Sequence, residues 1–142
     1  MKKTLISIIL IIFVLTASTY LFLLNLQNKQ KAVRDENQEF EYYLNKTIYG
    51  KDLATIIDRA IDKNEKNRIE KDEKNHYIEN EENSIRIEVK IEETKKTYAM
   101  EEIYKNNIQE FMKHFNLAKF TCTMIEYHNK TGKIKKMVFQ EI

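Results

Sequence analysis

The chain has one cysteine, no proline, no tryptophan and only two glycines among its 142 residues. A single cysteine, Cys122, excludes an internal disulfide, so the fold must be held together by a hydrophobic core. Phosphate-binding loops, Rossmann turns and nucleophile elbows each need several glycines at fixed spacing. Gly50 and Gly132 supply none of these patterns, and the composition therefore excludes those sites.

Charge is absent from residues 5–26, which are almost entirely apolar. A helix that crosses a bilayer needs roughly 20 such residues, so this segment is long enough to span a membrane. A signal peptide cleaved near Ala17 or Ser18 is the alternative. The apolar run continues through Tyr20–Leu24, where a signal peptide turns polar, and this favours an uncleaved anchor.

The part of the chain after the span also has no net charge, because it contains all 22 acidic residues and 22 of the 24 basic ones. Nucleic-acid binding relies on excess Lys and Arg, and it is therefore not predicted. Residues 70–102 are acid-rich, and residues 113–136 hold six lysines against the single acid Glu126. Either an ordinary solvated face or a docking patch for an acidic partner explains this asymmetry.

Basic residues flank the span on both sides, with Lys2 and Lys3 before it and Lys29, Lys31 and Arg34 after it. Because they nearly balance, the positive-inside rule leaves both orientations open. The very short segment before the span favours a cell-membrane protein with its N-terminus inside and its C-terminal domain outside.

Helical periodicity continues beyond the span. Val33, Phe40, Leu44 and Ile48 share one helix face, which predicts an amphipathic stem over residues 27–49, ended by a left-handed cap at Gly50. A second helix is expected from Lys51 or Asp52, and residues 62–76 are expected to form its end and a surface loop. Its apolar stripe consists of Leu53, Ile56, Ile57, Ala60 and Ile61.

Strand patterns dominate the rest of the chain. Ser84–Glu92 alternates strictly between apolar and charged residues, with Tyr77 and Ile78 as its expected partner across the Asn80–Asn83 turn. Thr97–Tyr104 is a further expected strand, and Ile108–Phe115 a short helix. Phe120–His128 and Ile134–Phe139 form an expected hairpin, whose turn is closed by Gly132.

These patterns predict an α+β fold with two N-terminal helices on an antiparallel sheet of four or five strands. The expected organisation is a membrane anchor at 1–26, a stem helix at 27–49 and an extracytoplasmic domain at 50–142.

No catalytic, cofactor-binding or metal-binding residues are predicted. His76, His114 and His128 lack the local spacing of zinc ligands, although a site assembled from separate elements stays open. Cys122 and His128 lie about 20 Å apart along one strand, too far for a dyad, so Cys122 is expected to be a buried apolar residue. The doublets Glu81–Glu82, Glu92–Glu93 and Glu101–Glu102 point to opposite strand faces and are expected to be solvated.

The layout of basic start, apolar helix, amphipathic stem and small sheet resembles pilin-like and pseudopilin-like proteins. Within Phe40–Asn64, the sequence Tyr49-Gly50, then Asp52-Leu53-Ala54-Thr55-Ile56-Ile57 and the ending Asp62-Lys63-Asn64, is similar to small anchored proteins of tight-adherence pilus systems in Gram-positive bacteria. Prepilins have a glycine before the apolar helix and an early glutamate; here the first acid is Asp35. The resemblance therefore implies a non-polymerising accessory subunit.

The leading hypothesis is a non-enzymatic, single-pass accessory subunit that docks to other membrane or cell-surface proteins. The alternative is an anchored binding or sensor module for a small ligand or a cell-wall polymer. An enzyme is the third hypothesis, and it requires convergent carboxylates or a histidine beside Cys122 in a cleft.

Overall fold

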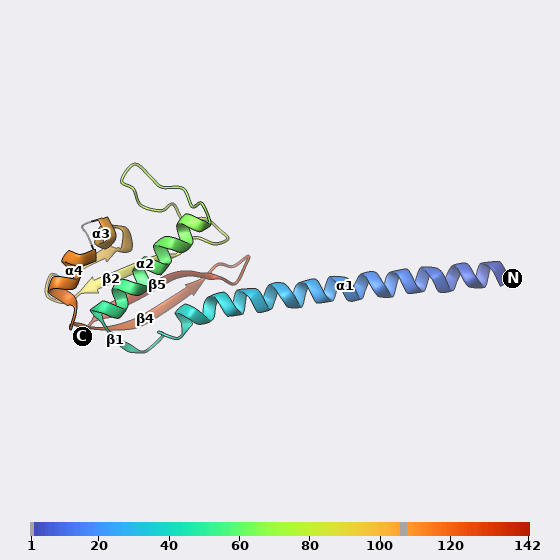
Figure 1. Cartoon of the computed structure of the whole chain (residues 1–142), viewed down its shortest axis with the longest axis horizontal. Helices are drawn as coiled ribbons and strands as arrows, with labels where there is room; N and C mark the ends of the chain where they lie inside the picture. Colours follow the sequence, from blue (N-terminus) through green and yellow to red (C-terminus); the bar gives the residue numbers. More distant parts are fainter. Residues whose placement is uncertain (1, 106–107) are drawn as a thin grey trace. The chain divides into compact units, whose positions relative to one another are not determined.

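The computed structural model describes residues 2–105 and 108–142 and divides into two compact units, one up to Asp35 and the other Glu36–Ile142. Helix α1 (Lys2–Glu41) makes up the first unit and supplies the first residues of the second. The second unit is an α+β domain with a five-stranded sheet (Figure 1). The predicted α+β class and the long apolar N-terminal helix are confirmed.

The sheet is mixed, and the prediction of a purely antiparallel sheet is wrong. Its strands are β1 (Thr47–Tyr49), β2 (Arg86–Ile91), β3 (Lys96–Ala99), β4 (Lys119–Tyr127) and β5 (Ile134–Glu141), in the order β1-β4-β5-β2-β3. The β2–β3 and β4–β5 hairpins are antiparallel, as are β1 and β4. The two hairpins join through β2 and β5, which run parallel. Local sequence patterns specify each hairpin but not how one hairpin meets the other.

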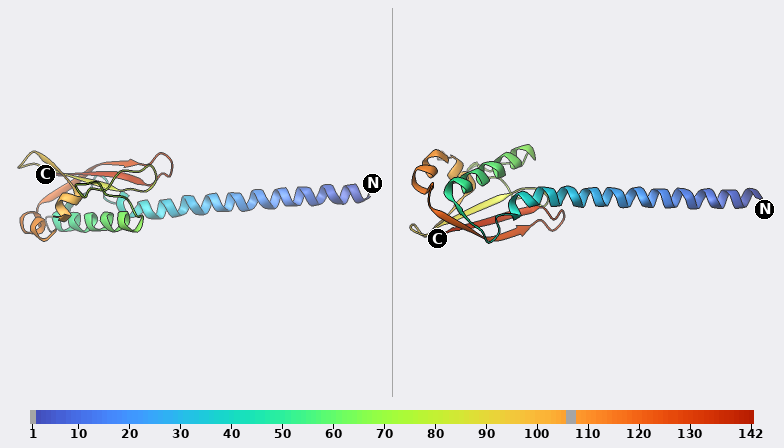
Figure 2. Two further views of the ribbon diagram at one scale, coloured as in Figure 1. Left: turned by 90° about the horizontal axis from the view of Figure 1, so that it is seen from above. Right: turned by 60° about the horizontal axis from the view of Figure 1, so that its bottom comes forward.

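Three helices cover one face of this sheet: α2 (Gly50–Lys66), α3 (Met100–Lys105) and α4 (Ile108–Phe115). Figure 2 shows α2, in green, lying along this face. The predicted strand over Thr97–Tyr104 is only half right, because β3 ends at Ala99 and a helical turn follows. The Glu102 carboxylate accepts a hydrogen bond from the Ala99 N–H at 2.8 Å, which is the capping that a helix start requires.

The predicted stem helix over residues 27–49 also needs correction, because α1 ends at Glu41. Asn45 takes a left-handed conformation with φ of 58°, and it turns the chain into β1. The β1 residues Thr47, Ile48 and Tyr49 are β-branched or aromatic, the types that fit a sheet. β1 pairs with β4, so these residues belong to the domain rather than to a stem.

Gly50 does not form the expected left-handed cap; it is the first residue of α2 and is buried. A Cβ atom at Gly50 would lie 1.9 Å from the carbonyl oxygen of Phe115, so close packing between α2 and the end of α4 requires glycine. Gly132 has φ of 69° in the β4–β5 turn, which confirms the prediction for that position.

The segment between α2 and β2 contains no partner strand for β2, contrary to expectation. Tyr77 forms an isolated antiparallel bridge with Lys71, and the Ile78 N–H donates to the Glu70 carbonyl at 2.8 Å. Asn80 folds the following turn through its side-chain oxygen, which accepts N–H groups from Glu82, Asn83 and Ser84. A polar side chain that binds its own backbone in this way competes with strand pairing.

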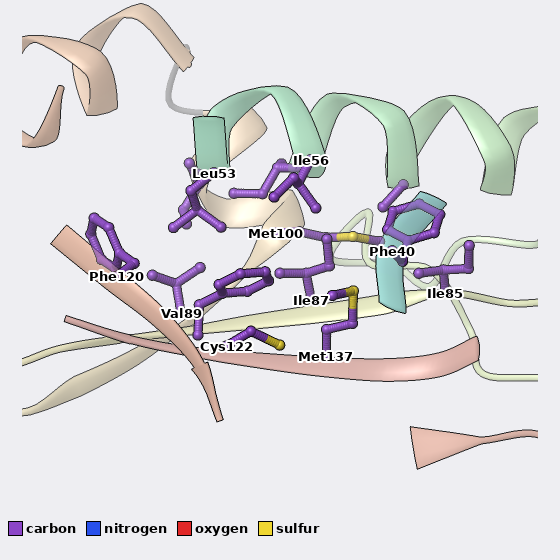
Figure 3. Packing of buried hydrophobic residues seen from close by; sticks show 14 of the residues in the cluster. Phe40, Leu53, Ile56, Ile85, Ile87, Val89, Met100, Phe120, Cys122 and Met137 are labelled. Atoms are coloured by element: carbon purple, nitrogen blue, oxygen red, sulfur yellow. The ribbon is translucent and has the colours of Figure 1, made fainter. Parts of the chain in front are cut away.

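The hydrophobic core lies between the helices and the sheet (Figure 3). The alternation predicted over Ser84–Glu92 is confirmed, because all four of its apolar residues are buried. The predicted apolar stripe of α2 is buried as well. Phe40, from the last turn of α1, lies in the same core. The largest fully buried apolar side chains are Phe40, Phe120, Phe139, Leu53, Ile56, Ile57, Ile87, Met100, Met137 and Val89.

Candidate interaction surface

The helix α4 covers the sheet incompletely. Its apolar face consists of Ile108, Phe111, Met112 and Phe115, at the spacing that the sequence predicts for an amphipathic helix. No residue of α4 is buried, whereas eight residues of α2 are. This face is therefore the least covered part of the helical layer.

Aromatic stacking holds α4 against the sheet. The rings of Phe111 and Phe115 stack 5.1 Å apart with 29° between their planes, and both approach Phe120 of β4, at 6.1 and 6.3 Å. Stacked and edge-to-face ring pairs at such distances add stabilisation beyond burial alone. The backbone of α2 reinforces this placement, because the Gly50 N–H donates to the Ala118 carbonyl at 2.9 Å.

A pocket of about 210 Å³ opens beside this stack, between the β2–β3 hairpin, α3 and α4. Its lining is mostly apolar, and polar groups stand around it. The lining residues are Ile91, Thr94, Tyr98, Glu102, Ile103, Glu110, Phe111, His114 and Phe115. At this size the pocket accepts one ring or branched aliphatic group, and it is smaller than the 300–1,000 Å³ typical of sites for drug-sized ligands.

The charged groups around this pocket already have partners. Glu102 accepts the Ala99 N–H, and Glu110 pairs with Lys113 at 2.9 Å. The His114 Nε2 lies 3.8 Å from the other Glu110 oxygen. Lys113 thus compensates the charge of Glu110, while Glu102 is held by a backbone N–H, and the lining between these groups is mostly apolar.

A second apolar feature lies at one end of the sheet. Leu117 is 77% exposed and Ile142 is 68% exposed, the two most exposed large apolar side chains in the domain. The Ile142 N–H donates to the Lys119 carbonyl at 3.0 Å, and Lys119 pairs with Tyr49 of β1. We call Tyr49, Leu117 and Ile142 the sheet tip. The turn of the β4–β5 hairpin lies at the opposite end of these strands.

Pairing within the domain explains the charge asymmetry of the sequence. Lys135 contacts Glu79 at 2.7 Å, Lys136 contacts Glu88 at 3.0 Å, and Lys130 pairs with Glu81. The basic segment 113–136 therefore meets the acid-rich segment 70–102. This geometry favours a neutralised, solvated face over a docking patch for an acidic partner.

The three histidines are in separate places. His76 follows the Asp72 turn, His114 is on α4, and His128 is buried at the end of β4 with its Nε2 2.8 Å from the Ser84 carbonyl oxygen. Within residues 2–105 and 108–142, no group of three or more His, Cys, Asp and Glu is placed to hold a metal ion.

Cys122 is fully buried in the core, which agrees with the sequence prediction of a buried apolar residue. Burial raises the pKa of its thiol to about 11, so the thiol stays protonated at neutral pH. A thiol in this state is a weak nucleophile. The structure thus gives Cys122 a packing role.

The acidic doublets also have local structural contacts. Glu81 pairs with Lys130 and Glu92 with Lys95. In the third doublet, Glu101 is buried and accepts the Tyr77 N–H at 3.1 Å, while Glu102 caps α3. Glu101 therefore departs from the expected solvated state.

Sequence reasoning missed two buried asparagines. The Asn64 amide donates to the Ile85 carbonyl and accepts the Ile85 N–H, both at 2.8 Å. Asn37 does the same with the Gly132 carbonyl at 2.8 Å and the Ile134 N–H at 3.0 Å. The sequence does mark both residues, because each asparagine occupies a position on the apolar face of its helix. Asn64 continues the stripe of α2, and Asn37 lies between Val33 and Phe40.

Comparison with known proteins finds no family model, no curated protein and no solved structure that matches this chain. Fold and sequence together define an α+β domain that follows one helix long and apolar enough to cross a membrane.

Proposed function

We propose that the protein is a single-pass membrane protein whose domain docks to other membrane or cell-surface proteins and performs no catalysis. The membrane anchor is supported by the exposure of the apolar side chains in the first part of α1. The most apolar window of this helix is entirely unburied, with Phe13 70% and Leu21 65% exposed. Such a surface is stable in lipid and unfavourable in water.

The hydroxyl groups within this helix support the proposal. Thr16 donates to the Phe13 carbonyl at 2.9 Å, and Ser18 and Thr19 donate to the Leu15 carbonyl at 3.0 and 2.8 Å. In hydrocarbon, polar groups must be satisfied inside the segment itself. These three side chains meet that condition.

The docking role is supported by the domain's surface rather than by a reactive centre. The sheet tip and the half-covered face of α4 expose apolar groups, while Glu110 beside the pocket pairs with Lys113. An accessory subunit of pilin-like type, with its N-terminus inside and its domain outside the cell membrane, fits this arrangement. Polymerisation is not proposed, because no acid precedes Asp35.

Crosslinking in membranes tests this function. A photo-reactive amino acid at Leu117 of the full chain, in the native host, should trap specific membrane or surface proteins upon illumination. The matched control places the same amino acid at Lys66, which is exposed at the end of α2. If neither position traps a protein, or if both trap the same set, the docking role fails.

One observation, the pocket beside α4, favours the second candidate function, which is an anchored binding module. Its test is saturable binding of a small aromatic compound such as indole to the full chain in lipid nanodiscs.

A further inference from the structure

The pocket beside α4 has the size of one side chain. A cavity of 150 Å³ lined by apolar residues is known to hold a benzene ring, so the 210 Å³ here are enough for a phenyl ring or a branched aliphatic group. A free molecule of that size makes few contacts, and their free energy offsets little of the entropy lost on association. The same group carried on a polypeptide gains additional contacts around the pocket.

The neighbouring strand can supply those contacts. β3 is an edge strand, paired with β2 on one side only. The Ala99 N–H donates to Glu102 and therefore points away from β2. Because backbone groups alternate in direction along an antiparallel strand, Thr97 also presents its N–H and C=O to the outer edge.

Tyr98 connects the pocket with the outer edge of β3. Tyr98 lies between Thr97 and Ala99, and its side chain lines the pocket on the helix-covered side. A strand added to β3 would run about 4.8 Å away. Every second side chain of that strand would face the same side of the sheet as Tyr98, which is the side on which the pocket lies.

We infer that β3 pairs with an extended segment of a partner protein, which inserts one aromatic or branched aliphatic side chain into the pocket. The inference rests on the proposed docking function, for which it names the partner's chemistry. Recognition combines main-chain hydrogen bonds at Thr97 with an apolar anchor between Ile103 and Phe111.

A peptide probe tests the inference directly. A blocked, fluorescent hexapeptide of sequence Lys-Thr-Phe-Thr-Lys-Thr is titrated against the full chain in nanodiscs and followed by fluorescence anisotropy. We expect saturable binding that weakens about tenfold or more when Ala replaces the Phe. Binding should also be lost when the peptide backbone is N-methylated, because the pairing hydrogen bonds then cannot form.

Two variants locate the site. Ile103→Phe fills the pocket and should abolish peptide binding, while Lys66→Phe adds the same ring at the exposed end of α2, outside the pocket, and should leave binding unchanged. Thr97→Pro removes the outward N–H, a change that edge strands tolerate, and should also abolish binding. Thermal unfolding verifies that each variant is folded.

Equal binding of the Phe and Ala peptides would overturn the inference, as would unchanged binding to Thr97→Pro. Binding of toluene without binding of the peptide would also overturn it, in favour of a small-molecule site. Its failure is distinguishable from failure of the docking function: crosslinks at Leu117 without peptide binding refute the inference alone. Peptide binding without crosslinks refutes docking in the membrane and retains the site.

Discussion

The amide of Asn64 forms both hydrogen bonds that the backbone of Ile85 would otherwise lack where β2 enters the core. Asn64→Leu fits the apolar stripe of α2 but leaves that N–H and C=O unpaired. Each such buried group costs about 1–3 kcal/mol, so we expect a loss of about 3 kcal/mol in the free energy of unfolding. Urea titration monitored by tyrosine fluorescence measures it. Asn116→Leu, at an exposed position, should change stability by less than about 0.5 kcal/mol.

The two glycines should respond differently to substitution. Gly50→Ala places a methyl group against the Phe115 carbonyl and forces α2 from α4, which we expect to cost about 3 kcal/mol. Gly132→Ala meets only the strain of a positive φ, about 1–2 kcal/mol. Gly132→Asn should restore most of that loss, because asparagine tolerates this conformation. The melting temperature should fall most for Gly50→Ala, less for Gly132→Ala and least for Gly132→Asn. Equal losses at both glycines would contradict the close contact assigned to Gly50.

The thiol of Cys122 gives a pH-dependent prediction. Burial raises its pKa from 9.0 to about 11, so at pH 8 the thiolate fraction falls about 100-fold relative to an unperturbed thiol. Labelling by Ellman's reagent should be slower by at least that factor in the folded protein, and immediate in urea. The raised pKa also stabilises the fold below pH 9, and this contribution disappears as the pH rises through 11. Fast native labelling at pH 8 would place the thiol near solvent.

Among the elements, those with strong local periodicity could be predicted and those that depend on distant partners could not. The alternation of β2, the stripe of α2, the spacing of α4 and the β4–β5 turn all lie within short windows. The parallel pairing of β2 with β5 joins residues about 50 positions apart and has no local signature. Three-residue β1 forms only because β4 is beside it. The pocket depends on how α3 and α4 meet the hairpin, and no motif in the sequence marks it.

The last turns of α1 are attached to the domain by a cluster of charges centred on Lys63. Its Nζ lies 3.2 Å from Glu39 and 3.9 Å from Glu36, and 4.8 Å from the centre of the Phe40 ring. The Lys63 side chain is only 20% exposed, so these contacts are partly shielded from solvent. Lys63 thus adds to the other contacts of this helix end, which are the Lys133–Glu36 pair at 2.8 Å, the hydrogen bonds of Asn37 and the buried ring of Phe40.

We expect Lys63→Ala to destabilise the domain by about 1–2 kcal/mol and to speed amide hydrogen exchange over Gln38–Tyr43. Arg59→Ala removes a more exposed pair with Glu39 and should cost less than about 0.5 kcal/mol. Hydrogen exchange measured by mass spectrometry resolves the segment. Uniform exchange changes across the whole domain would show that Lys63 acts on global stability rather than on this attachment.

For the whole molecule, the proposed membrane anchor requires that the domain lies on one side of the membrane, and the proposed function places it outside. The basic flanks of the span nearly balance, so the positive-inside rule decides little. Labelling of a single reporter cysteine on intact cells determines the orientation directly. Glu93 is exposed in the β2–β3 turn, whereas neighbouring Lys95 has φ of 55° and is a poorer site for substitution. Cys122→Ala removes the native thiol without placing a polar group in the core.

In the Cys122→Ala, Glu93→Cys variant, a membrane-impermeant maleimide applied to intact cells should label the domain fully, because we propose that it lies outside. The matched control replaces Thr4, at the start of the span, with cysteine in the same background, and should label only after lysis. Deletion of residues 5–26 should release the chain from the membrane fraction, which tests the anchor separately. Labelling of Glu93→Cys only after lysis would place the domain inside the cell. Docking to cell-surface proteins would then be excluded, and the partner segment for β3 would have to be sought among cytoplasmic proteins.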